Sequence, residues 1–164
     1  MNYDIEKLVD KVVREIAPES PSASAKTKRM TLALARQIVE SVKLKAAEIG
    51  VKAVVAVADG GGNIITVDSM DDAYIASYDI AVNKAFTSVS LKMSTYELSQ
   101  LARPDGPLYG IQNTNNGRIV IFGGGEPLCV NNSVLGGVGV SGGSAEEDTF
   151  LGQYGREVFE QLCK

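Results

Sequence analysis

The chain has 164 residues, of which 45% are hydrophobic and 22% are charged, a balance typical of one folded domain with a buried core. Its net charge of −4 excludes a nucleic-acid partner, because nothing in the bulk charge attracts a phosphate backbone. No apolar run approaches the roughly 18–20 residues that cross a bilayer, so we expect no membrane partner. Cys129 and Cys163 have neither metal-ligand nor disulfide spacing, which indicates a reducing, cytoplasmic location.

The sequence contains no histidine, and this is the most restrictive feature of its composition. Histidine is the usual general base near neutral pH and the commonest metal ligand. Its absence excludes Ser-His-Asp and Cys-His catalysis, His-ligated zinc and haem held by a proximal histidine. Any chemistry must therefore come from carboxylates, lysine, tyrosine, backbone amides or a bound cofactor.

Residues 1–16 are predicted to contain an amphipathic helix that is separate from the rest of the chain. Residues 17–29 follow as a Pro-, Ser- and Ala-rich linker. A short helix behind a linker is marginal in water unless its apolar face is covered. The arrangement resembles the encapsulation peptides that direct cargo into bacterial microcompartments, and the alternative is that the helix packs on its own domain or a sister subunit. The apolar, candidate partner-binding positions are Ile5, Leu8, Val9, Val12, Val13 and Ile16.

Residues 30–164 read as one α+β domain. Thr31 is a predicted N-cap for a helix that ends near Gly50, and Ser94 and Ser144 each open a predicted capping box. A further helix is predicted over residues 72–93. Predicted strands cover residues 51–58, 64–67, 118–122, 127–130 and 134–140. Hairpins in place of βαβ units favour a five-stranded antiparallel sheet flanked by helices.

Two glycine-rich segments are the first candidate ligand site, because exposed amides beside a helix N-terminus accept anionic groups. The alternative is that these glycines serve tight turns and strand bends. The candidate ligand-binding residues in them are Gly123, Gly124, Gly125, Glu126, Gly142, Gly143 and Ser144.

Four further candidates lie outside the glycine segments. Asp79 and Lys84 share a predicted helix, and a buried lysine there would act as a base or pair with an acidic ligand group; the alternative is a solvated face or a tertiary ion pair. Arg103 and Tyr109 lie in a Pro/Gly-rich loop where binding groups tend to gather, or serve only to cap it. The acids at residues 146–148 would suit a hard cation, but the helix dipole already explains them.

Four consecutive motifs carry a resemblance to a known family. They are DIAVNKA at residues 79–85, LYGI at 108–111, IFGGGEP at 121–127 and GVGVSGG at 137–143. In this order they resemble the GlcG/HbpS-like family, whose domain also forms the C-terminus of PduO-type proteins. The resemblance implies a profilin-like fold, a homo-oligomer, haem binding or degradation in some members, and a link to bacterial microcompartments.

Haem is the cofactor that the resemblance implies, but this chain has no histidine to ligate iron. Haem would need a Tyr, Cys, Met, Lys or Thr ligand, or would be held by apolar contacts and its propionates alone. Flavin and cobalamin are alternative cofactors. We therefore predict a protein that binds a cofactor or small molecule as microcompartment cargo. The alternatives are a haem- or flavin-dependent redox enzyme, an enzyme that acts on a small anionic metabolite through Lys84, and a non-catalytic assembly subunit.

Overall fold

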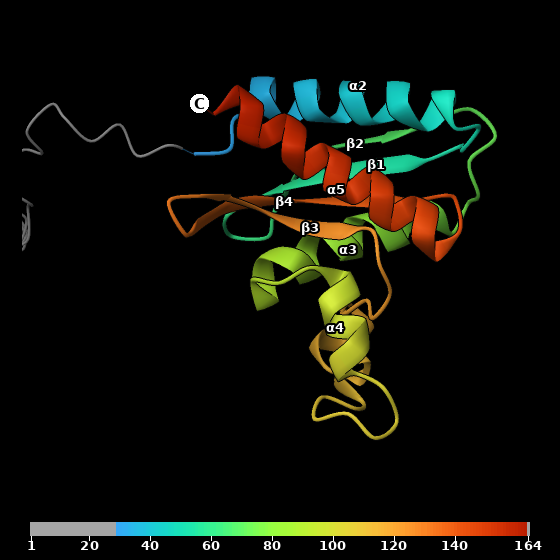
Figure 1. Cartoon of the computed structure of the whole chain (residues 1–164), viewed down its shortest axis with the longest axis vertical. Helices are drawn as coiled ribbons and strands as arrows, with labels where there is room; N and C mark the ends of the chain where they lie inside the picture. The colour runs from blue at the N-terminus through green and yellow to red at the C-terminus, as the bar shows by residue number, and fades with distance from the viewer. Residues whose placement is uncertain (1–28, 164) are drawn as a thin grey trace, which may run out of the picture.

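A computed structural model describes residues 29–163, so the predicted helix and almost all of the predicted linker lie outside the described residues. Figure 1 shows one sheet with helices on both faces. The helices are α2 (Leu32–Glu48), α3 (Ser77–Leu91), α4 (Thr95–Leu101) and α5 (Ala145–Leu162), and two short 3-10 turns cover Ile111–Asn113 and Asn115–Gly117. The strands are β1 (Val54–Asp59), β2 (Ile64–Ser69), β3 (Gly125–Val130) and β4 (Ser133–Ser141).

The sheet is antiparallel throughout, with strand order β2-β1-β4-β3. Successive side chains of β1 alternate between its two faces. Val55 and Val57 pack with α2 and α5 in the larger core, whereas Val54 and Ala56 pack with α3 in the smaller one. The sheet therefore separates two apolar layers, and the C-terminal half of β4 is buried between them.

The three predicted side-chain caps at helix N-termini are confirmed. Thr31 accepts a hydrogen bond from the Leu34 amide at the start of α2. Ser94 and Ser144 both form complete capping boxes, with Glu97 and Glu147 as their respective partners. These contacts are local, which is why the sequence pattern alone reveals them.

The prediction of five strands is wrong, because the described residues contain four. Residues 118–122 have no strand partner. Instead, Thr87 of α3 donates from its hydroxyl to the Arg118 carbonyl over 3.3 Å and accepts from the Val120 amide over 3.0 Å. The Thr87 side chain thus forms hydrogen bonds that the backbone of a neighbouring strand would otherwise have formed with residues 118–122.

The helix predicted over residues 72–93 begins later, at Ser77. Asp72 adopts a positive φ of 65°, a left-handed conformation that a helix does not continue through. The α+β class and the antiparallel sheet are otherwise confirmed, while the profilin-like label stays a prediction. Within residues 29–163, no helix has the length and hydrophobicity needed to cross a membrane.

Candidate functional site

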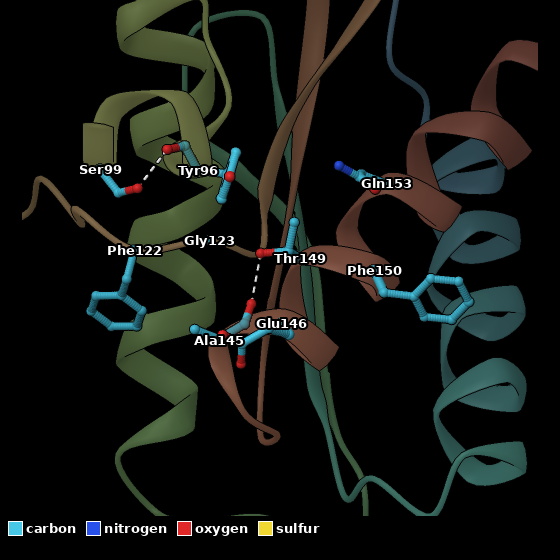
Figure 2. A pocket seen from close by; sticks show the side chains of 9 residues that line it. All are labelled: Tyr96, Ser99, Phe122, Gly123, Ala145, Glu146, Thr149, Phe150 and Gln153. Carbon is cyan, nitrogen blue, oxygen red and sulfur yellow. Dashed lines mark hydrogen bonds between the residues drawn. The ribbon is translucent and has the colours of Figure 1, made fainter. Parts of the chain in front are cut away.

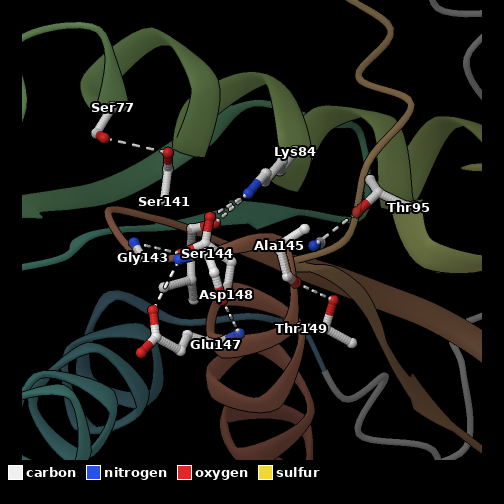
Figure 3. Close-up of polar contacts among 12 residues, drawn as sticks. Ser77, Lys84, Thr95, Ser141, Gly143, Ser144, Ala145, Glu147, Asp148 and Thr149 are labelled. Carbon is white, nitrogen blue, oxygen red and sulfur yellow. Dashed lines mark hydrogen bonds and ion pairs between the residues drawn. The ribbon is translucent and has the colours of Figure 1, made fainter. Parts of the chain in front are cut away.

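A buried ion pair joins α3 to α5 beside the glycine-rich strands (Figure 3). Lys84 Nζ lies 2.7 Å from Asp148 Oδ2 and donates a second hydrogen bond, also of 2.7 Å, to the Val140 carbonyl. The Lys84 side chain is fully buried and that of Asp148 is 5% exposed. Burial lowers the pKa of Lys84 and raises the pKa of Asp148, since desolvation opposes both charges, while their mutual attraction opposes both shifts.

Glycines are required where the strands approach this pair. A Cβ on Gly124 would lie 2.6 Å from the Val140 carbonyl oxygen and 2.8 Å from Lys84 Nζ, and its φ of +117° is one that other residues rarely adopt. A Cβ on Gly125 would lie 2.6 Å from the Lys84 carbonyl oxygen. These two glycines therefore allow α3 to pack directly on the sheet. This agrees with the alternative that the glycines serve tight turns and strand bends.

The amides of the second glycine segment already have acceptors inside the protein. Gly143 donates to Asp148 Oδ1 over 2.9 Å, and Ser144 donates to Glu147 Oε2 over 2.7 Å. The chain's own carboxylates thus occupy positions where the sequence predicted an external anion. Binding of a ligand by Gly142, Gly143 and Ser144 stays a prediction.

A surface cavity of about 320 Å³ lies against the other side of the first glycine segment (Figure 2). One wall comes from α4, the other from the first half of α5, and the connection before β3 lies between them. Its aromatic residues are Tyr96, Phe122 and Phe150, which are 52%, 43% and 47% exposed. Among the described residues that line it, Glu146 is the one with a charge. The lining therefore suits a flat, mostly apolar ligand.

Phe122 connects this cavity with the buried ion pair. Its ring centroid lies 4.8 Å from Lys84 Nζ, which is within range of a cation–π interaction. Lys84 consequently does not face the solvent, and Phe122 covers it on the cavity side. The predicted residues Lys84, Gly123 and Gly124 are brought together here, although Lys84 acts as an internal partner in this arrangement.

Glu126, the fourth residue of the first segment, belongs to a different contact. It is 2% exposed, and its Oε2 lies 3.2 Å from Arg156 Nη1 of α5. Burial raises its pKa to about 7, although the Arg156 charge opposes that rise and Glu97 adds to it. Glu126 therefore points toward α5, among groups that do not line the aromatic cavity.

The other predicted site residues lie apart from the ion pair. Asp79 is exposed in the first turn of α3. Arg103 is exposed and donates to Gln100 within its own stretch of chain, and Tyr109 is 65% exposed. The segment that follows α4 projects away from the sheet in Figure 1. Ligand binding by Asp79, Arg103 and Tyr109 stays a prediction.

Sequence reasoning missed Asp148, Tyr96 and Phe150. It treated Asp148 as one of three helix-start acids, yet a lysine among apolar α3 residues was a signal that a buried counterion is needed. Tyr96 and Phe150 gave no signal, because only the packing of α4 beside α5 brings them together. Between residues 29 and 163, no group of three or more His, Cys, Asp or Glu is arranged to hold a metal ion.

Comparison with known proteins identifies the family. The profile described as haem degrading protein HbpS-like matches residues 30–157. The chain belongs to the HbpS-like family. A 15.0 kDa protein of Citrobacter freundii, described by its place in the dhaT-dhaS intergenic region, is 45% identical over 133 residues, which cover 81% of this chain and 94% of that protein.

The PduO relatives are longer proteins. The corrinoid adenosyltransferase PduO of Citrobacter freundii is 32% identical over 150 residues, which cover 90% of this chain but 43% of that enzyme. Less than half of PduO is therefore represented here. The adenosyltransferase activity in that protein's name is not assigned to this chain.

Solved structures agree with the family assignment. Klebsiella pneumoniae ORFY superposes with a TM-score of 0.79 at 43% identity and covers 86% of this chain and 98% of its own. A PduOC–heme complex gives a TM-score of 0.77 at 32% identity, covering 80% of this chain and 95% of its own. HbpS of Streptomyces reticuli, as a double mutant, gives 0.73 at 26% identity, covering 86% and 95%.

Proposed function

We propose that this protein binds haem or a closely related tetrapyrrole in the cavity formed by Tyr96, Phe122 and Phe150. The observation that carries the proposal is this aromatic cavity between α4 and α5. The similarity to a PduOC–heme complex supports it independently. Aromatic rings stack on flat conjugated ligands, and exposed aromatic rings are a costly surface to leave in water.

The lining residues fit a porphyrin in part. Phe122 and Phe150 offer apolar faces to the macrocycle, and Tyr96 offers a phenol oxygen of the type that ligates haem iron in catalase. Glu146 would repel the propionates, so the acidic edge should face the solvent. Bound haem would supply redox or oxygen chemistry, while the protein's part is to hold the ring and shield one face from water.

A titration of ferric haem into the protein tests this function, with the Soret absorbance followed to saturation. We expect one haem per chain, and a loss of affinity of about tenfold or more in Phe122→Ala, because that change removes a stacking face. Tyr74→Ala is the matched control, since it removes an aromatic ring that is 73% exposed and does not line the cavity, and it should leave the affinity unchanged. Unsaturable binding, or equal losses in both variants, would contradict the proposal and favour the assembly-subunit alternative.

The iron ligand requires a separate measurement. In Tyr96→Phe the ring remains but the phenol oxygen is lost, so we expect retained stacking with an altered ferric spectrum. Tyr78→Phe, at another half-exposed tyrosine, is the control. An unchanged spectrum in Tyr96→Phe would show that the iron has no phenolate from this position. The same titration with flavin and cobalamin decides between haem and the two alternative cofactors.

We also propose that residues 1–16 direct the protein into a microcompartment by binding shell proteins. The support is the amphipathic pattern and the Pro- and Ser-rich stretch behind it, together with the PduO relatives. A reporter fused to residues 1–29 should co-localise with shells. Leu8→Asp with Val12→Asp should abolish this, whereas Lys7→Asp with Lys11→Asp on the polar face should not. A reporter that stays diffuse would contradict the targeting role.

A further inference from the structure

A second hollow lies at the N-terminal end of α2, where the described residues begin. Its volume is about 550 Å³, and Arg29, Met30 and Leu32 form one side of it. The turn between β1 and β2 forms the other side, with Ile65 on β2 and Leu135 on β4. We call this hollow the entry groove, because the chain enters the domain along it.

The floor of the entry groove is an extension of the larger core. Met30 is 6% exposed and belongs to that core, and Ile65 and Leu135 are half-buried hydrophobic residues packed against it. Leu32 stands at the rim with 47% of its surface exposed. The described residues thus leave apolar side chains partly uncovered in this hollow, beside the polar residues Arg29, Thr31 and Asp59.

The turns that border the entry groove are held in place. Asp59 Oδ1 accepts hydrogen bonds from the amides of Gly61, over 2.8 Å, and Asn63, over 3.0 Å. A Cβ on Gly60 would lie 3.2 Å from the Val134 carbonyl oxygen, so the turn between β1 and β2 lies close to the start of β4. The entry groove is therefore a preformed surface, which lowers the cost of ordering a partner on it.

We propose that the amphipathic segment of residues 5–16 docks with its apolar side chains in the entry groove of the same chain. Twelve residues, 17–28, join this segment to Arg29 at the groove's edge, and extended chain of that length reaches roughly 40 Å. A helix of twelve residues is about 18 Å long, so the connection is long enough for the segment to fold back.

The chemistry of the two surfaces is complementary. The segment carries its apolar side chains at i, i+3, i+4, i+7 and i+8, as helices that lie in apolar grooves do. Tethering also favours the same chain over a second copy, because a short linker gives a high effective concentration. The inference does not depend on haem binding, since the entry groove and the aromatic cavity share no lining residue. Docked and shell-bound states of residues 1–16 would compete.

Photo-crosslinking of the full chain tests the docking. With Val12 replaced by p-benzoylphenylalanine, illumination and peptide mapping should give cross-links to Met30, Leu32 or Leu135 within one chain. The matched control places the same residue at Lys11, on the polar face. It should give at least about fivefold less of these products, because a side chain on the polar face points away from the groove when the segment is docked.

Two further measurements make the result decisive. Mixing isotopically light and heavy chains before illumination distinguishes the same chain from a second copy, and heavy–light products in the entry groove would overturn the proposal. Leu135→Asp should remove the cross-links while an unchanged circular dichroism spectrum confirms the fold. Cross-links to other surfaces, or equal yields from positions 11 and 12, would also overturn it. These outcomes are read without haem or shells, so they stand apart from the function proposed above.

Discussion

Glu126 offers the sharpest quantitative test of the electrostatics. It is 2% exposed and has Arg156 as its ion-pair partner, yet burial raises its pKa from 4.5 to about 7. The change we consider is Glu126→Gln, which removes the charge but keeps an oxygen that accepts from Arg156. The folded protein holds a proton on Glu126 more tightly than the unfolded chain does, so ionisation of this residue opposes folding.

The magnitude follows from the two pKa values. Between pH 4.5 and 7 the folded state binds more protons at Glu126 than the unfolded state, so the free energy of unfolding falls as the pH rises. From pH 5 to pH 8, the part of this loss due to Glu126 is about 2.5 kcal/mol. Glu126→Gln should therefore leave the stability nearly unchanged at pH 5 and raise it by about that amount at pH 8.

Urea unfolding of wild type and Glu126→Gln at both pH values measures the effect. The difference between the two proteins isolates this residue from every other titrating group. Glu157→Gln, at an exposed acid of α5 that is not among the charges acting on Glu126, is the matched control and should change the pH dependence little. If wild type and Glu126→Gln lose the same stability from pH 5 to pH 8, the assignment of Glu126 as a buried acid with a raised pKa is refuted.

Three other substitutions test separate contacts. Lys84→Met leaves the buried Asp148 without its ion-pair partner and should lower the free energy of unfolding by about 3–5 kcal/mol. Adding Asp148→Leu should recover much of this loss in the same urea experiment, and no recovery would contradict a paired role. Gly139→Ala places a Cβ 2.1 Å from the Ala81 carbonyl oxygen and should cost about 2–3 kcal/mol, so an unchanged melting temperature would contradict this packing. We predict a homo-oligomer, and Ile75→Asp, at a side chain 97% exposed, should shift light scattering toward the monomer. An unchanged scattering mass would contradict a role of Ile75 in the interface.

The sequence predicts well where the cause is local. Thr31, Ser94 and Ser144 cap helices within three residues of themselves, and all three caps are present. Residues 118–122 show the limit of such reasoning, because β-rich composition does not reveal whether a partner strand exists. Thr87, more than thirty positions earlier in the chain, takes the place of that partner.

The same distinction between local and distant contacts applies to the candidate site. The glycines at 123–125 mark a real close approach of backbone and helix, so their pattern indicated the right region. The counterion of Lys84 lies 64 residues away, and Tyr96 and Phe150 meet across two helices. Contacts of that separation depend on how α3, α4 and α5 pack, which periodicity does not encode. The predictions for residues 1–16 concern a part of the chain outside the described residues.

The most direct test of haem binding in the aromatic cavity is paramagnetic broadening in the NMR spectrum of the ferric haem complex. Diamagnetic gallium protoporphyrin serves as the reference, so that only the effect of the iron is read. We predict strong broadening of signals from Tyr96, Phe122 and Phe150, with sharp signals from Ile65 and Leu135 in the entry groove. Broadening centred on the entry groove, or spread evenly over the surface, would contradict the proposed site.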